Sequence, residues 1–202
     1  WVPDLDFAVI ADGLDNGTST TVTGGYDMLF NDDGNLVVVG NFGTVQGTSA
    51  QNIAVLDPDG VLSPNGEDTG GVFNSTGFPP IIKTISNLGD RFIIGGSFNT
   101  YSNVGIPAVS SQFVIPIAEE LTVNFGDGFY NGTVDNYTPT SIAVRNNKFV
   151  VTGNFISYDT NGANKVVRIN PDGSYDSTFD SSVGVTSSLL FNALEYTAID
   201  KD

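Results

Sequence analysis

The sequence contains neither cysteine nor histidine among its 202 residues. Without cysteine the chain has no disulfide bond and no thiolate metal site, although this absence does not assign a cellular compartment. Without histidine it lacks the usual general base at neutral pH and the commonest transition-metal ligand. A catalytic triad built on histidine or cysteine is therefore excluded.

Basic residues are also scarce: seven Lys and Arg stand against 23 Asp and Glu, which gives a formal net charge of −16. Seven scattered cations form no phosphate-binding stripe, so we expect no nucleic-acid partner. No apolar run approaches the ~18–20 residues that span a bilayer, and an anionic membrane surface would repel the chain, so we expect no membrane insertion.

Glycine and phenylalanine are abundant instead. The chain has 24 Gly and 14 Phe, and its hydrophobic content of 40% is enough for a globular core. Short apolar runs separated by Gly, Asn, Asp and Ser clusters favour many short strands with tight turns over long helices. The composition therefore predicts an all-β fold.

A Gly-x-Phe corner recurs at a nearly constant period, at Gly40–Phe42, Gly96–Phe98 and Gly153–Phe155, with Phe spacings of 56 and 57 residues. A fixed period of this kind indicates a repeat architecture. Each corner follows a predicted hairpin, and a third predicted strand comes after it. The predicted strands are Tyr26–Phe30, Leu36–Val39 and Asn52–Leu56; Ile81–Ile85, Phe92–Ile94 and Val109–Ile115; and Ser141–Val144, Phe149–Val151 and Lys165–Ile169.

The third strand of the first and third repeats ends in a Pro-Asp-Gly turn, at Asp57–Gly60 and Asn170–Gly173. A fourth strand is predicted to follow and to lead to a Phe, at Phe73, Phe125 and Phe179. The second repeat has Ile115–Leu121 in place of the turn, where we predict a helical turn.

The corner glycine is expected to end its strand where blades crowd together, and the corner Phe to fill the gap between them. Four strands in each ~55-residue unit is the content of one propeller blade, so we predict a β-propeller of four-stranded blades. The predicted segments are residues 1–23 (end of a preceding repeat), 24–75, 76–132 and 133–186 (three whole repeats) and 187–202 (start of a further repeat). We expect the rest of a longer parent chain to complete the ring. A β-sandwich or an elongated array of β-modules remains open as an alternative architecture.

The repeat resembles a known family, the delta-60 repeat of large bacterial exterior proteins and bacteriophage structural proteins. The resemblance covers nearly the whole chain and is strongest in the third repeat, at Lys148, Gly153–Phe155, Tyr158, Arg168, Asn170–Ser174, Asp176 and Phe179. It implies a β-propeller fold and an extracellular or virion-surface location. It implies no catalytic residues, because the positions that match are structural ones.

Candidate binding residues lie in the loop after each corner, where the copies disagree: Asp159–Asn164, Thr44–Ala50 and Tyr101–Pro107. Tyr101, Tyr158, Asp159 and Asn161 could stack on a sugar ring or bond its hydroxyls, whereas a structural role would have the tyrosines close the blade edge with their hydroxyls in solvent. No cofactor is predicted. Asn170, Asp172, Ser174 and Asp176 alternate as calcium ligands do, but the glycine spacing differs from that of a calcium loop, which favours a solvated turn.

No catalytic residue is predicted. The adjacent carboxylates Asp32 and Asp33, and Glu119 and Glu120, point to opposite faces if they lie on strands. We therefore predict a non-enzymatic structural and binding module, such as a tail, fibre or capsid-decorating part of a virion. Its partners would be other subunits of a large assembly or a surface glycan. A bacterial adhesin, a glycan-processing enzyme domain and a spacer array are the alternatives.

Overall fold

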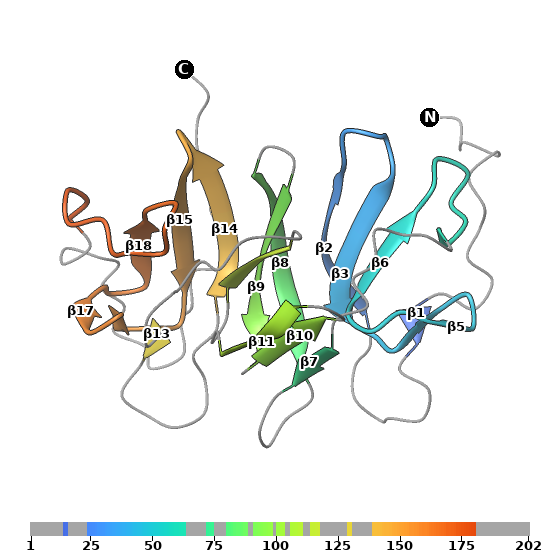
Figure 1. Cartoon of the computed structure of the whole chain (residues 1–202), viewed down its shortest axis with the longest axis horizontal. Coiled ribbons are helices and arrows are strands. Elements are labelled where there is room, and N and C mark those ends of the chain that lie inside the picture. The colour runs from blue at the N-terminus through green and yellow to red at the C-terminus, as the bar shows by residue number, and fades with distance from the viewer. Residues whose placement is uncertain are drawn as a thin grey trace.

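The computed structural model consists of β-strands joined by tight turns and loops (Figure 1). It describes residues 14–15, 24–63, 72–74, 80–88, 91–98, 100–103, 106–110, 114–117, 129–130 and 139–180. Within these ranges there is no α-helix, and no helix therefore has the length and hydrophobicity that a membrane span requires. The predicted all-β class is confirmed.

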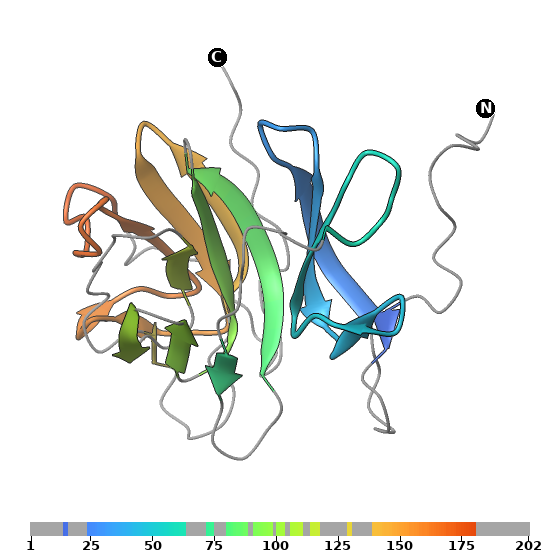
Figure 2. The ribbon, with the colours of Figure 1, turned by 45° about the vertical axis from the view of Figure 1, so that its right-hand side comes forward.

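Three large antiparallel sheets follow one another along the chain. The first contains β2 (Gly24–Phe30), β3 (Leu36–Asn41) and β6 (Ile53–Leu56), the second β8 (Ile81–Leu88), β9 (Arg91–Ser97) and β12 (Val114–Ile117), and the third β14 (Pro139–Arg145), β15 (Lys148–Gly153) and β18 (Val166–Ile169). In each sheet the middle strand in space is the one that leads into the corner. The three sheets lie side by side in chain order (Figures 1 and 2).

Three small sheets accompany the large ones, all at the lower side of the molecule in Figure 1. They contain β1 (Leu14–Asp15), β4 (Thr44–Val45) and β5 (Thr48–Ser49); β7 (Val72–Asn74), β10 (Thr100–Asn103) and β11 (Ile106–Ser110); and β13 (Phe129–Tyr130), β16 (Ser157–Tyr158) and β17 (Asn161–Gly162). The last two strands of each small sheet form a hairpin directly after the corner, here called the corner hairpin. The first strand comes from the chain that precedes the large sheet.

This pairing changes the role of the predicted fourth strand. β7 forms around Phe73, but it pairs with β10 of the next corner hairpin and not with β6. The first strand of each small sheet thus precedes a repeat boundary predicted from sequence, and the other two strands follow that boundary. The boundaries themselves stay a prediction. Directly after the Pro-Asp-Gly turns, within the described residues up to 63 and up to 180, the pairing consists of single bridges, Leu56 with Leu62 and Ile169 with Tyr175.

No fourth strand reaches Phe179, and that prediction is wrong. The carboxylate of Asp176 accepts the backbone N–H of Thr178 at 3.0 Å, and the N–H of Phe179 bonds the carbonyl of Asp176 at 3.1 Å. These local bonds form a turn directly after the bridge, and a side chain that caps its own backbone in this way competes with strand pairing. Phe125, the counterpart in the second repeat, lies outside the described residues.

The second repeat differs from its prediction in one further place. The strand predicted over Val109–Ile115 is two strands, β11 and β12, which pair with different partners, β10 and β9. Residues Val114–Ile117 are extended, so a helical turn does not begin at Ile115. The apolar run in the sequence does not show whether one strand or two will form, because strand pairing depends on the neighbouring strands that each segment contacts in the fold.

The sheets pack against one another through aliphatic and aromatic side chains. Val37 and Val39 of the first sheet form one buried cluster with Ile85, Ile94 and Phe98 of the second. Ile93, on the opposite face of the second sheet, belongs to the cluster of the third. Phe98 therefore fills the space between sheets, as expected for a corner Phe. Phe42 does not, because its cluster consists of residues of its own repeat together with Leu14 of the preceding segment.

The corner glycines are required for a different reason from the one predicted. A Cβ at Gly40 would lie 2.1 Å from the carbonyl oxygen of Gly24, on the partner strand of the same hairpin. A Cβ at Gly96 would lie 2.1 Å from the carbonyl of Ile81, at the same place in the second repeat. Crowding by the next blade is instead found one residue earlier, where a Cβ on Gly95 would meet Ile142 of the third sheet at 2.9 Å.

A polar contact also recurs between successive sheets. The carboxylate of Asp27 accepts the N–H of Ile85 at 3.0 Å, and the hydroxyl oxygen of Thr84 accepts the N–H of Ile142 at 3.3 Å. Asp27 and Thr84 stand at the same register position, directly after the bulge in the first strand of their sheets. Each contact satisfies a backbone donor at a bulge, where the ladder is locally disrupted.

Candidate functional site: the corner hairpins

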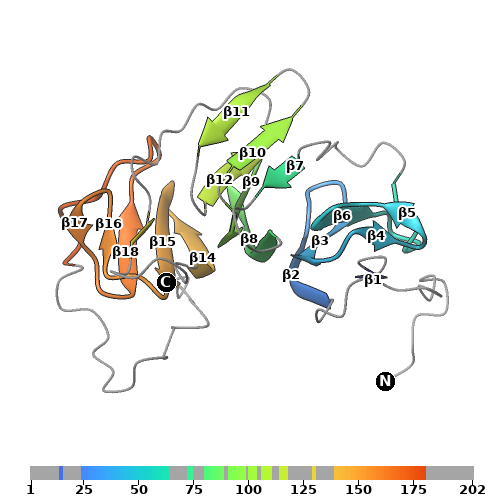
Figure 3. The ribbon, with the colours of Figure 1, turned by 90° about the horizontal axis from the view of Figure 1, so that it is seen from below.

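The three corner hairpins contain the segments in which the amino-acid sequences of the repeats differ. All three hairpins lie on one side of the molecule (Figures 1 and 3). The β2–β3 and β14–β15 turns lie at the opposite end of the sheets (Figure 1). The corner hairpins thus form a set of repeated, outward-pointing tips, which is the arrangement that a multivalent binding edge requires.

Two of the hairpins have tips of two residues. Val45 pairs with Thr48 and Tyr158 with Asn161, so Gln46–Gly47 and Asp159–Thr160 form the turns. All four turn residues have positive φ, from 45° at Asp159 to 74° at Gly47. Positive φ at both central positions defines a type I′ turn, the turn whose twist matches a two-residue hairpin. Thr160 is β-branched and is strained there.

Each of these hairpins is anchored by one fully buried side chain, Val45 in the first repeat and Tyr158 in the third. Val45 pairs with Leu14, and Tyr158 with Phe129. The rings of Tyr158 and Phe129 lie 4.9 Å apart, within the range of favourable aromatic pairs. The tips are therefore short projections from an ordered core.

A second contact joins each hairpin to the Pro-Asp-Gly turn of its own repeat. The Tyr158 hydroxyl donates a short hydrogen bond to the carbonyl of Gly173. In the first repeat the amide of Gln46 donates to the equivalent carbonyl, that of Gly60, at 2.9 Å, and its oxygen accepts the N–H of Leu62 at 3.2 Å. Sequence reasoning missed this link, because two different residue types at neighbouring positions make it.

The four predicted site residues occupy different environments. Tyr158 is buried, so its ring offers no face to a ligand, and the expectation that its hydroxyl would reach solvent is wrong. Asp159 is half-buried at the tip, and Asn161 is exposed with its amide donating to the carbonyl of Asp159 at 2.8 Å. Tyr101 lies on β10 opposite Phe73, and its side chain is outside the description.

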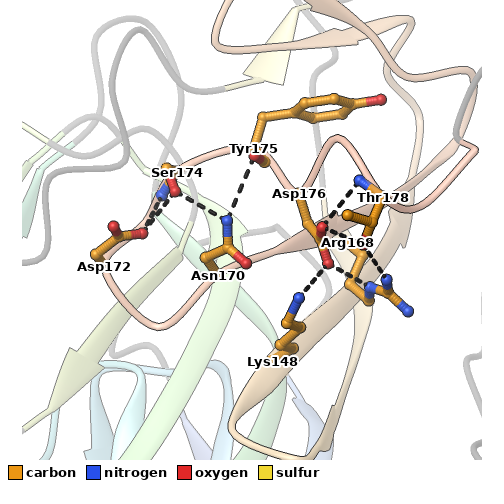
Figure 4. A network of polar contacts seen from close by, with 8 residues as sticks. All are labelled: Lys148, Arg168, Asn170, Asp172, Ser174, Tyr175, Asp176 and Thr178. Carbon is orange, nitrogen blue, oxygen red and sulfur yellow. Dashed lines mark hydrogen bonds and ion pairs between the residues drawn. The ribbon is translucent and has the colours of Figure 1, made fainter.

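Next to the third hairpin lies a polar network centred on Asp176 (Figure 4). One oxygen of this buried carboxylate accepts from Nζ of Lys148 at 2.6 Å and from Nε of Arg168 at 2.7 Å, and the other accepts from the hydroxyl of Thr178 at 2.7 Å. The hydrogen bond from Lys148, followed by those from Thr178 and Arg168, holds the pKa of Asp176 well below its ordinary value of 3.8, against the opposing effect of burial. Arg168 also lies 5.0 Å above the ring of Phe179.

The turn predicted as a candidate calcium loop is satisfied by its own residues. Asp172 accepts the hydroxyl of Ser174 at 2.6 Å and its N–H at 2.9 Å, and these bonds lower the pKa of Asp172. Asn170 donates to the hydroxyl of Ser174 at 3.0 Å. A cation at Asp176 would have to displace Lys148 and Arg168. Within the described residues, no three acidic side chains converge to hold a metal ion.

The carboxylates considered for catalysis are not brought together. Asp32 and Asp33 are both exposed in the β2–β3 turn, at the end of the sheets opposite the corner hairpins (Figure 1). Glu119 and Glu120 lie outside the described residues. At and directly after the tips, the described corner hairpins expose hydroxyl and amide groups, on Thr48, Ser49, Thr160 and Asn161. Such groups can donate and accept hydrogen bonds to a polypeptide backbone or a sugar hydroxyl.

Residues 32–64 and 145–179 each match the model of a family described as "Domain of unknown function (DUF5122) beta-propeller". The chain is a β-propeller repeat protein. The two matches begin at equivalent points, before β3 and before β15, and run through the corner, the corner hairpin and the Pro-Asp-Gly turn. They cover less than half of the propeller chain. No curated protein matches it.

Proposed function

We propose that this propeller segment is a non-enzymatic structural and binding module of a large exterior protein, a virion component such as a tail, fibre or capsid-decorating part. Its corner hairpins would contact other subunits of the assembly or a glycan on a host surface. The resemblance of the third repeat to bacteriophage and bacterial exterior proteins supports the location. The scarcity of basic residues argues against a nucleic-acid role.

The observation that carries the proposal is the contrast between the anchor and the tip of each hairpin. Val45 and Tyr158 are completely buried, whereas the adjoining residues Thr48 and Asn161 are exposed. A rigid projection loses little conformational entropy when it binds, so it suits recognition. Repetition of the projection along one side adds avidity, because several weak contacts can form at once.

Binding of the labelled chain to intact bacterial cells and to a glycan array tests this proposal. The double variant Thr48→Lys/Asn161→Lys places one lysine directly after the tip of each of two corner hairpins. Asp33→Lys is the control: it lies at the opposite end of the sheets and changes the net charge by the same amount. We expect the tip variant to lower the apparent affinity at least about tenfold, or ~1.4 kcal/mol, and the control to bind like wild type.

The same assay distinguishes binding from catalysis. A binding module leaves the array glycans intact, whereas a glycan-processing enzyme releases soluble sugars from them. Absence of binding by the wild-type chain to every cell and glycan, or equal binding by the tip variant, contradicts the role proposed for the hairpins.

A further inference from the structure

The tip of the third corner hairpin contains a residue in a strained backbone conformation. Thr160 has a φ of 66°, in the left-handed region that β-branched side chains rarely adopt. The first corner hairpin has Gly47 at the equivalent position of its turn, with a φ of 74°. Glycine adopts this conformation without steric cost. The third repeat therefore carries a side chain that the turn does not need and that makes the turn less stable.

The contacts of Thr160 do not account for this strain. Its side chain is exposed, and among the described residues none forms a hydrogen bond with its hydroxyl. The tip of the first hairpin differs, because the side chain of Gln46 bonds the backbone of Gly60 and Leu62. Strained residues of this kind cluster at ligand-binding and active sites. The strain at Thr160 therefore indicates a role in contact with another molecule.

A second exposed polar group lies directly beside Thr160. The amide nitrogen of Asn161 donates to the carbonyl of Asp159 at 2.8 Å, which orients the amide and leaves its oxygen as an acceptor with no partner among the described residues. The Thr160 hydroxyl can both donate and accept. The hairpin that carries both groups is anchored by the fully buried Tyr158. The two groups are thus positioned before a ligand arrives, which limits the entropy lost on binding.

The chemistry of this tip restricts the class of ligand. The hairpin Ser157–Gly162 contains no cation and one carboxylate, that of Asp159, and the whole chain has a net charge of −16, so an acidic ligand would be repelled. Trp, Tyr and Arg anchor most protein contacts and Thr is under-represented in them, yet the one aromatic residue of this hairpin, Tyr158, is buried. Neighbouring hydroxyls of a neutral sugar both donate and accept, as the hydroxyl of Thr160 and the amide of Asn161 do.

We propose that Thr160 and Asn161 form a binding site for a neutral glycan, in which the Thr160 hydroxyl and the Asn161 amide bond neighbouring hydroxyls of one sugar. This inference rests on the function proposed for the corner hairpins and assigns the sugar contact to the third of them. Two hydrogen bonds to one sugar give a weak site, so measurable binding requires a dense display of the glycan. The strain at Thr160 is the stability that the fold gives up to present the hydroxyl.

The test combines binding of the whole chain to a dense array of neutral and of sialylated or sulfated glycans with thermal denaturation of each variant. Thr160→Gly should raise the melting temperature and yet lower the apparent affinity for neutral glycans about fivefold or more. Thr160→Val keeps the branched shape without the hydroxyl and should lower the affinity by a similar factor. Thr160→Ser keeps the hydroxyl and should bind within about twofold of wild type. Ser177→Ala removes an exposed hydroxyl elsewhere in the third repeat and should bind like wild type.

The outcomes separate this site from the general role of the hairpins. If Thr48→Lys/Asn161→Lys loses binding while Thr160→Gly and Thr160→Val bind like wild type, the hairpin function stands and the Thr160 site is wrong. Stronger binding to acidic than to neutral glycans, or binding to cells that survives periodate oxidation of their sugars, also overturns the site. So does a lower melting temperature of Thr160→Gly, because the side chain would then support the fold itself. A wild-type chain that binds no cell and no glycan contradicts both the hairpin function and this site.

Discussion

The hydroxyl of Tyr158 donates a hydrogen bond to the backbone carbonyl of Gly173, and this contact ties the third corner hairpin to the Pro-Asp-Gly turn of its repeat. The two residues are far enough apart in sequence that no local pattern links them. The same carbonyl in the first repeat, that of Gly60, is reached by Gln46. The function of the bond is therefore preserved between repeats although the residue that makes it is not.

Replacing Tyr158 by Phe removes the hydroxyl donor and leaves the buried carbonyl of Gly173 without this hydrogen bond. We expect the free energy of unfolding to fall by about 1–2 kcal/mol in urea denaturation. The control is Tyr175→Phe, because the Tyr175 hydroxyl points away from the network in Figure 4. An equal loss in both variants would show that the bond to Gly173 contributes nothing specific.

Tyr158 also predicts a dependence of stability on alkaline pH. Burial, reinforced by the charges of Asp159 and Asp172, raises the pKa of Tyr158 far above its ordinary value of 10.0. A raised pKa in the folded state means that the stabilisation is complete below pH 10 and is lost as the pH rises above it. Between pH 9 and roughly pH 11 the wild type should therefore lose more stability than Tyr158→Phe, which has no proton to release.

Gly40 should tolerate no side chain, whereas Gly24 on the partner strand should. The Cβ of Gly40→Ala would lie 2.1 Å from the carbonyl oxygen of Gly24, but a Cβ at Gly24 meets no atom within 4 Å. We expect Gly40→Ala to lower the free energy of unfolding by about 3 kcal/mol and Gly24→Ala to change it by less than ~0.5 kcal/mol. Equal effects on thermal or urea denaturation would mean that the strands are not paired in this register.

Thr160 offers a stabilising substitution. Its φ of 66° is unfavourable for a β-branched residue, and the equivalent position of the first repeat is Gly47. Thr160→Gly should raise the free energy of unfolding by about 0.5–1 kcal/mol, and Gly47→Thr should lower it by a similar amount. The reciprocal pair serves as its own control, since opposite signs are expected if both tips are type I′ turns.

Asp176 should make the stability sensitive to acid. Its pKa is lowered in the folded state, so its stabilising contribution is complete above its unfolded pKa near 3.8 and is lost as the pH falls below that value. The side chains of Lys148 and Arg168 are 34% and 30% exposed, so solvent weakens the pairs. We expect Asp176→Asn to cost ~2 kcal/mol at pH 7. In paired urea titrations this difference from wild type should shrink below pH 4; a difference that is constant with pH would contradict the ion-pair account.

The sequence predicted the parts of the fold that local chemistry decides. Asn146 and Asn147 predicted a tight turn, and both have positive φ between paired strands. The Pro-Asp-Gly turns and the hairpins before each corner were predicted for the same reason, since the residues at a turn dictate its backbone conformation.

Pairing between distant segments could not be predicted in this way. Leu14 and Asp15 form a strand only because Val45 and Thr44 lie beside them, and two residues carry no periodic signal. Asp27 lies within the strand predicted over Tyr26–Phe30, but no local pattern shows that its carboxylate accepts a backbone N–H from the next sheet. At the candidate site, the exposed tip at Asn161 was found by comparing copies, whereas the burial of Tyr158 depends on Phe129, contributed by a distant segment.

The central claim is that the repeats form successive sheets stacked in one register, and amide hydrogen exchange measured by NMR tests it most directly. The amides of Ile85 and Ile142 should exchange slowly in the wild type, since each is bonded to the preceding sheet. Asp27→Ala should accelerate exchange at Ile85 by about tenfold, and Thr84→Val should accelerate exchange at Ile142 by about tenfold. Thr84→Val should also accelerate Ile85, by a smaller factor, because the Thr84 hydroxyl donates to the Asp27 carboxylate at 3.1 Å. Two results would contradict the stacked arrangement. One is fast exchange of both amides in the wild type, and the other is exchange that stays unchanged when the acceptor residue in the preceding sheet is replaced.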